Sequence, residues 1–174
     1  DDHNAPALLV RPDGRYLAVY GKHGPENCFY YRRSTRPHDP THWDAERRYV
    51  PSESTRPTYS NLHWVAAEKR IYNFFRGLDN SYKPSYCYSD DMGESWKTGN
   101  VVIRVPTRER HRPYVKYVSN GRDTIHLFYT EGHQRSFDNS IYNPVYRVGW
   151  LHTSDGKRVK RLADRALAAI SAEL

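Results

Sequence analysis

Three strand-like segments recur along the chain at intervals of roughly 53 to 55 residues, and this repeat constrains the fold more than any other feature. The segments are 15–20, 70–75 and 124–129, and each follows a turn and another short apolar strand. The interval is the length of one four-stranded β-propeller blade. The repeat therefore predicts an all-β chain of three blades, over approximately 1–50, 51–105 and 106–159.

The turn at 89–96 reads Ser-Asp-Asp-Met-Gly-Glu-Ser-Trp and connects two strand-like segments. Gly93 can adopt a positive φ, Asp91 can accept hydrogen bonds from amides across the turn, and Trp96 begins the return strand with a large apolar surface. The pattern resembles the Asp-box, the hairpin turn of sialidase-like β-propellers. Looser versions occur at 34–43 and 153–156.

Composition supports strands over helices, since the chain has 15 Tyr, 11 Pro and 10 Gly. The mean hydropathy is −0.92, and no apolar run approaches the roughly 18 residues of a membrane span, so we expect no membrane partner. Three blades cannot close a ring, so we expect this chain to be part of a larger single domain. Residues 160–174 have apolar positions at helical spacing, but in a propeller they should form an outer strand, linker or tail.

The net charge of +7 favours a polyanionic partner. Nucleic acid would be the default polyanion for such a basic chain, but no recognition-helix or RNA-binding motif is present. Cys28 and Cys87 lie on the predicted third strands of successive blades, where a disulfide is geometrically open. We expect them instead to be small buried apolar side chains.

Histidines and their counterparts in the next blade fall at one end of the predicted sheets. His3 precedes the first strand of its blade and His23 follows the second, and antiparallel pairing brings these positions together. The corresponding positions of the second blade are Tyr59 and Arg76. In the third blade the equivalent stretches contain His111, Arg112 and His133, so the rim is polar and basic throughout.

Several stretches together resemble the BNR-4 propeller family, particularly its ulvan lyases: Asp-His-Asn-x-Pro-Ala-Leu, Gly-x-His-Gly, Thr-Tyr-x-Asn, Phe-Phe-Arg-Gly, Arg-Pro-Tyr-x-Lys and Asn-Ser-Ile-Tyr. The resemblance implies a seven-bladed propeller that cleaves a sulfated uronate-containing polysaccharide by β-elimination. It also implies a catalytic set of His3, His23, Tyr59 and Arg76. Tyr88 with Arg104 has a comparable spacing, but Tyr88 adjoins the turn at 89–96, at the opposite end of the blade.

This chemistry suits the residue types. Elimination removes the C5 proton of a uronate, and a guanidinium such as Arg76 can pair with the carboxylate beside the developing carbanion. His3 is suited to accept the proton, Tyr59 to donate one to the leaving oxygen, and His23 to position the carboxylate. The scheme requires no cofactor or catalytic metal ion, and a structural metal ion stays open. Candidates for binding further sugars or sulfates are His111, Arg112, Lys116, His133, Asn139 and Tyr142.

Two alternatives remain at the level of the sequence. A sialidase-like glycoside hydrolase would need several arginines around the sugar carboxylate and a Tyr/Glu nucleophile pair, whereas only Arg76 stands out. A non-catalytic carbohydrate-binding propeller would keep an aromatic, basic rim without needing two histidines. We expect the protein to be a monomer. We also expect it to be secreted, because a polysaccharide substrate cannot enter a cell before it is cut.

Overall fold

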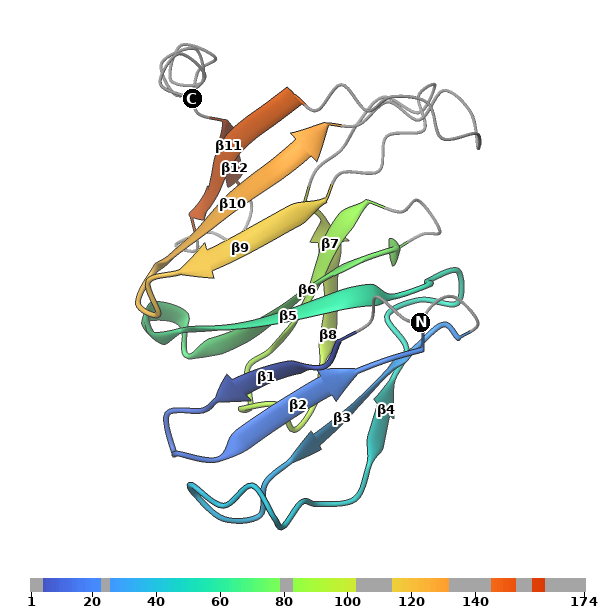
Figure 1. The fold of residues 1–174 in the computed structure, drawn as a ribbon, viewed down its shortest axis with the longest axis vertical. Coiled ribbons are helices and arrows are strands. Elements are labelled where there is room, and N and C mark those ends of the chain that lie inside the picture. The colour runs from blue at the N-terminus through green and yellow to red at the C-terminus, as the bar shows by residue number, and fades with distance from the viewer. Residues whose placement is uncertain are drawn as a thin grey trace.

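The computed structural model describes residues 5–22, 26–78, 83–102, 114–131, 145–152 and 158–161. Within them the chain forms three antiparallel four-stranded sheets, each with its strands in chain order (Figure 1). The first sheet contains β1 (Ala7–Val10), β2 (Tyr16–Tyr20), β3 (Phe29–Arg33) and β4 (Arg47–Tyr49). The second contains β5 (Thr58–Val65), β6 (Arg70–Arg76), β7 (Pro84–Ser89) and β8 (Lys97–Val101). The third contains β9 (Val115–Ser119), β10 (Thr124–Glu131), β11 (Val145–His152) and β12 (Arg158–Arg161).

The all-β prediction is confirmed. The helical turn between β5 and β6, Ala66–Glu68, is of the 3-10 type, and the described residues contain no α-helix. No described helix has the length and apolar character needed to cross a membrane. The helical spacing noted near the C-terminus falls mainly on residues 162–174, which lie outside the described residues, as does the turn expected at 153–156.

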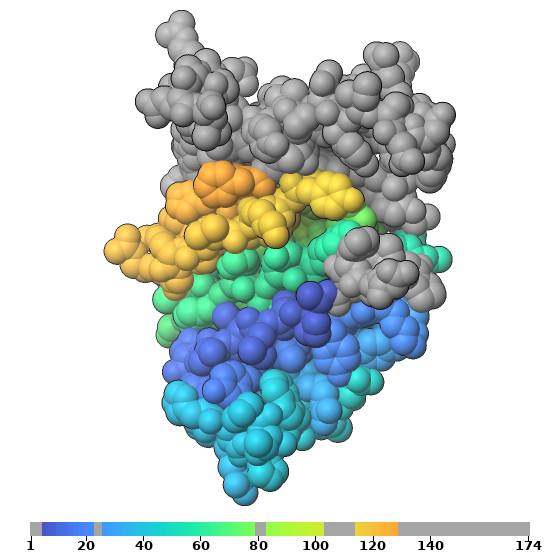
Figure 2. Space-filling model, viewed as in Figure 1, coloured from blue at the N-terminus to red at the C-terminus, as the bar shows by residue number. Residues whose placement is uncertain are grey.

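The second sheet lies between the other two. The first strands of the three sheets, β1, β5 and β9, run side by side (Figure 1). Space-filling shows the sheets stacked in chain order (Figure 2). The centre of β6 is consequently buried on both faces. Phe75 packs with Phe29 of the first sheet, and Phe74 stacks on Tyr117 of the third with ring centroids 4.5 Å apart. Apolar side chains alternating along the strands thus form two cores, one on each side of the second sheet.

The outward faces of the first and third sheets carry exposed apolar side chains. Leu8 and Val10 alternate with inward-facing residues on β1, and Val118 and Phe128 do the same on β9 and β10. Each of these four side chains is roughly half exposed or more. Large apolar side chains on a continuous sheet face are typical of a surface that packs against another layer.

The turn at 89–96 is closed by its own polar side chains. Asp91 accepts hydrogen bonds from the Ser95 amide (2.9 Å) and the Ser95 hydroxyl (2.5 Å), while the Ser89 hydroxyl accepts from the Gly93 amide (2.7 Å). Gly93 has φ +84°, as the sequence predicts. Trp96 is buried, and its ring meets Phe29 edge to face in the core between the first two sheets.

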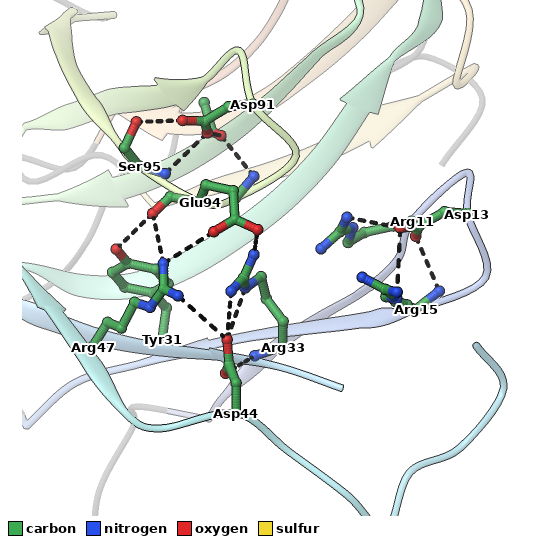
Figure 3. Close-up of polar contacts among 12 residues, drawn as sticks. Arg11, Asp13, Arg15, Tyr31, Arg33, Asp44, Arg47, Asp91, Glu94 and Ser95 are labelled. Atoms are coloured by element: carbon green, nitrogen blue, oxygen red, sulfur yellow. Dashed lines mark hydrogen bonds and ion pairs between the residues drawn. The ribbon is translucent and has the colours of Figure 1, made fainter. Parts of the chain in front are cut away.

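Charged groups join this turn to the first sheet (Figure 3). Glu94 forms ion pairs with Arg33 of β3 and Arg47 of β4, and its carbonyl accepts a hydrogen bond from the Tyr31 hydroxyl (3.1 Å). Arg33 also pairs with Asp44 at 2.6 Å. The turn therefore fixes how the first two sheets are oriented, at the end of the sheets opposite Arg76.

The stretch at 34–43 forms a longer loop than a tight turn. Ser34 and Trp43 form an isolated antiparallel bridge, and the Thr35 amide donates to the His42 carbonyl at 2.9 Å. Asp39 caps the interior of the loop by accepting hydrogen bonds from the Thr41 amide and hydroxyl.

Candidate active site

Tyr59 and Arg76 come from paired strands at one end of the second sheet. Arg76 is the last residue of β6 and pairs with Thr58, the first residue of β5 and the neighbour of Tyr59. Because antiparallel strands bring the start of one beside the end of the next, the two residues separated by the whole hairpin become neighbours. The structure therefore brings together Tyr59 and Arg76, two of the four residues that the sequence predicts to converge.

A tyrosine that immediately precedes the third sheet completes the cluster. The guanidinium carbon of Arg76 lies 4.7 Å from the ring centroid of Tyr59 and 5.3 Å from that of Tyr114. The two rings meet at 6.2 Å and 67°, an edge-to-face geometry. We call these three residues the Tyr59–Arg76–Tyr114 cluster. Cation–π contacts of this kind contribute about 0.5 to 2 kcal/mol each and hold the guanidinium beside the two rings.

Tyr114 lies in the stretch of the third blade that is equivalent to the one containing Tyr59, but the sequence analysis does not identify it as a site residue. It immediately precedes β9, and 53% of its surface is exposed. Two signals point to it: it is the tyrosine of the Arg-Pro-Tyr-x-Lys stretch, and it follows the basic run of the third repeat much as Tyr59 opens the second. In a chain with 15 tyrosines, composition does not distinguish it from packing residues.

Tyr59 sits in an irregularity of its strand. The register shifts between Thr58 and Asn61, so that Tyr59 and Ser60 together face one residue of β6. Tyr59 has φ +60°, in the left-handed region that residues with a Cβ rarely adopt. Such a β-bulge redirects a side chain relative to the regular alternation of the strand, and here it redirects Tyr59.

Gly77 fixes the backbone just after Arg76. Its φ is +112°, and a Cβ there would lie 2.2 Å from the Arg56 carbonyl oxygen. The Arg56 amide donates to the Gly77 carbonyl at 3.0 Å. Only glycine allows this close approach, so the end of β6 is anchored to the segment that leads into β5.

The electrostatics of Tyr59 favour its neutral form. Burial raises the pKa of the phenol, the charge of Arg76 acts in the opposite direction, and Tyr114 adds to the increase, so the pKa lies above the usual value of a tyrosine. At neutral pH the hydroxyl is therefore protonated. A protonated phenol beside a guanidinium can donate a proton while the cation holds an anionic group.

The other predicted site residues are distributed as follows. Lys116 lies on β9, two positions after Tyr114, with its side chain exposed. Outside the described residues lie His3, His23, His111, Arg112, His133, Asn139 and Tyr142. The described strands next to His3 and His23 have the expected pairing, since Ala7 at the start of β1 faces Val19 near the end of β2.

Tyr88 belongs to the opposite end of the second sheet. It pairs with Tyr72 and Lys97, and the guanidinium carbon of Arg70 lies 4.2 Å from its ring centroid. Arg104, its partner in the alternative assignment, lies outside the described residues. Arg70 and Tyr88 thus form a pair resembling Arg76 and Tyr59, but at the end of the sheet that carries the turn at 89–96.

The part of the chain that the structure describes contains no group of three or more His, Cys, Asp or Glu residues able to hold a metal ion. Cys28 and Cys87 are both buried and free, and burial raises the pKa of the Cys87 thiol.

Comparison with known proteins assigns the sequence to a family. The sequence family described as "BNR repeat-containing family member" matches residues 1–168. No curated protein matches the chain.

Solved structures show the same fold. An ulvan lyase of polysaccharide lyase family PL25 superimposes with a TM-score of 0.66 and 19% identity, over 90% of this chain and 40% of the lyase. The same kind of lyase bound to -[GlcA(1-4)Rha3S]- gives 0.65 and 18%, with the same coverage. The catalytic domain of a GH62 α-L-arabinofuranosidase from Coprinopsis cinerea gives 0.56 and 12%, over 89% of this chain and 48% of the domain. The fold is thus β-propeller-like, and the chain spans less than half of each of these structures.

Proposed function

The chain belongs to the BNR repeat-containing family, and from that premise we propose that it forms part of a polysaccharide lyase. The substrate is a sulfated, uronate-containing polymer, ulvan, which the enzyme cleaves by β-elimination. The observation that carries this proposal is the Arg76 guanidinium held 4.7 Å from the Tyr59 ring at one end of the second sheet. A cation beside a protonated phenol supplies two of the three groups that elimination next to a carboxylate requires, and the third is a base.

The similarity to the ulvan lyase structures supports the choice of substrate class, since one of them holds a segment containing a glucuronate and a sulfated rhamnose. The whole protein would then be a seven-bladed propeller, of which this chain supplies three blades. The exposed Leu8 and Val10 on one side and Val118 and Phe128 on the other fit faces that pack against further blades. The turn at 89–96 has the hydrogen bonds expected of an Asp-box.

Arg76 would bind the uronate carboxylate. Ionised, that carboxylate opposes removal of the C5 proton, because a second negative charge develops next to it. A guanidinium can pair with both carboxylate oxygens through donors in its own plane, whereas the rings of Tyr59 and Tyr114 engage it as cation–π partners. The aromatic contacts thus fix the cation before substrate arrives, which reduces the cost of ordering it in the transition state.

Proton transfers would be divided between Tyr59 and the histidines. In this scheme His3 takes the C5 proton, the C4–O bond breaks as the C4–C5 double bond forms, and Tyr59 gives its proton to the leaving oxygen. The phenol of Tyr59 enters the reaction protonated, because its pKa lies above neutral pH, and it therefore carries the proton that the leaving oxygen needs. His23 would help to neutralise or position the carboxylate. The products are one fragment with a new reducing end and one fragment whose new non-reducing end is an unsaturated uronate.

Binding of the rest of the polymer would fall to the basic rim of the third blade. Lys116 is exposed beyond Tyr114 and can attract a sulfate. The same role is proposed for His111, Arg112, His133, Asn139 and Tyr142. The net charge of +7 suits a polyanionic substrate. We further propose that the enzyme is secreted and monomeric.

The test distinguishes elimination from hydrolysis. Incubation of the full-length protein with ulvan should produce an ultraviolet absorbance from the unsaturated uronate in step with new reducing ends. A second candidate function is glycoside hydrolysis, which the likeness to the GH62 arabinofuranosidase favours. New reducing ends without ultraviolet absorbance would support that candidate, and binding without either signal would indicate a carbohydrate-binding propeller.

A further inference from the structure

A buried amide lies in the middle of β6, the strand whose centre is buried on both faces. Asn73 of β6 has 0% of its surface exposed, and its neighbours along the strand are Tyr72 and Phe74, which are equally buried. Burying an amide costs about 1 to 3 kcal/mol unless its polar atoms find partners. The polar atoms of the Asn73 side chain therefore need hydrogen-bond partners, and those partners indicate what the residue does.

Both ends of the Asn73 amide contact the bulge of β5. Its Oδ1 accepts a hydrogen bond from the backbone amide of Asn61 at 3.1 Å, and its Nδ2 donates to the hydroxyl of Ser60 at 3.4 Å. Asn61 in turn donates from its Nδ2 to the carbonyl of Tyr59 at 2.5 Å. A chain of side-chain hydrogen bonds thus leads from the core of the sheet to the backbone of Tyr59.

These hydrogen bonds compensate for an interruption of the strand ladder. Between Thr58 and Asn61 the regular pairing of β5 with β6 shifts by one residue, and the backbone of Tyr59 takes φ +60°. A left-handed conformation at a residue with a Cβ costs of order 1 to 2 kcal/mol and persists only where the surroundings enforce it. The side chain of Asn73 supplies a hydrogen-bond acceptor and a donor at the place where the backbone pairing of β5 with β6 is interrupted.

We propose that Asn73 is a positioning residue that holds the bulge and thereby directs the Tyr59 hydroxyl toward the substrate beside Arg76. The inference rests on the function proposed above for Tyr59, but the structural part of it can be tested separately. Asn73 acts through Ser60 and Asn61 and contacts no reacting group. Without it, Tyr59 relaxes toward an ordinary strand conformation, in which its side chain is no longer aimed by the bulge.

The test compares Asn73→Ala with Ile71→Ala in the full-length protein. Ile71 is buried on the same strand, so its truncation also creates a cavity, but it pairs with Trp64 at the far end of β5. Amide hydrogen exchange reports the structural effect: exchange at Asn61 should accelerate in Asn73→Ala and stay near the wild-type rate in Ile71→Ala. Asn73→Asp, whose protonated carboxyl offers the same acceptor and a donor, should restore protection as the pH is lowered.

Activity provides the second readout. With ulvan, and corrected for the folded fraction, Asn73→Ala should lower kcat about 10- to 100-fold with KM nearly unchanged, because Arg76 still binds the carboxylate. Asn61→Ala, on a less buried side chain, should give the same kcat defect even if Asn73→Ala does not fold. Unchanged Asn61 exchange in Asn73→Ala would overturn the positioning role, whatever the activity. Changed exchange with wild-type kcat would also overturn it, and absence of elimination in the wild type would refute the proposed function alone.

Discussion

The guanidinium carbon of Arg76 lies 4.7 Å from the ring centroid of Tyr59, although the two residues are 17 positions apart in the chain, at the two ends of the β5–β6 hairpin. The hairpin brings them to one end of the second sheet, and Tyr114, just before β9 of the third sheet, closes the cluster from the other side. The cluster thus joins two sheets, so its geometry depends on how those sheets pack.

The first prediction concerns the planar guanidinium of Arg76. Arg76→Lys keeps the charge but loses the planar pair of donors, so kcat on ulvan should fall about 100-fold while polymer binding persists. Arg70→Lys is the matched control, because Arg70 makes the equivalent contact with Tyr88 at the other end of the sheet. Steady-state kinetics on both variants test this, and equal losses would indicate a general structural effect.

The second prediction concerns the hydroxyl of Tyr59. Tyr59→Phe keeps the ring that contacts Arg76 but removes the proton donor, so elimination should fall about 10²- to 10⁴-fold with little change in thermal stability. Tyr88→Phe changes a half-buried tyrosine of the same sheet and should retain activity. Wild-type turnover by Tyr59→Phe would exclude Tyr59 as the acid.

The third prediction concerns the backbone beside Arg76. Gly77→Ala must place a Cβ against the Arg56 carbonyl at a φ of +112°, so it should lower the free energy of unfolding by about 2 kcal/mol or more and reduce activity. Gly121→Ala also has a positive φ, +72°, but its Cβ would meet no atom within 4 Å. Denaturant titration should show a much smaller loss for Gly121→Ala, and similar losses would contradict the role of the close approach.

The fourth prediction concerns acid stability. His63 of β5 lies between Phe74 and Tyr117, its Nε2 has no hydrogen-bond partner among the described residues, and burial lowers its pKa to about 4. The unfolded state takes up a proton near pH 6.5, so stability is complete above that pH and is lost as the pH falls toward 4. The free energy of unfolding should decrease by about 2 kcal/mol between pH 7.5 and pH 5 from this group.

Denaturant titrations of His63→Leu at the two pH values check this. The variant should lose most of that pH dependence, whereas His126→Gln, which changes an exposed histidine of β10, should keep it. An unchanged dependence in His63→Leu would show that another group causes the acid sensitivity.

The sequence predicts the three-sheet architecture because the repeat and strand alternation are local properties. It also predicts that Tyr59 and Arg76 meet, because antiparallel pairing alone brings them together. It does not predict the bulge, since the sequence at 58–61 lacks a glycine to mark the positive φ at Tyr59. Tyr114 was missed for a different reason: its contact with Arg76 depends on the packing of two sheets, which no local pattern encodes.

Gly93 and Gly77 show the same difference between what a local pattern predicts and what depends on distant contacts. Gly93 could be assigned to a positive φ from the motif around it, and the structure agrees. Gly77 ends the stretch Phe-Phe-Arg-Gly, which contains no turn pattern that would mark a positive φ, and its importance comes from the approach of Arg56, 21 positions earlier in the chain. Contacts between distant segments therefore account for most of what the sequence could not supply at this site.

The central claim, that Arg76 acts on a uronate carboxylate during elimination, is tested most directly by comparing substrates. The full-length enzyme would be incubated with native, desulfated and carboxyl-reduced ulvan while the ultraviolet absorbance of unsaturated uronate and the new reducing ends are followed. We predict cleavage of native ulvan with both signals, weakened binding of desulfated ulvan, and no cleavage of carboxyl-reduced ulvan or by the Tyr59→Phe, His3→Ala double variant. Cleavage of carboxyl-reduced ulvan at the native rate would contradict the role of Arg76, and elimination by the double variant would contradict the proposed acid and base.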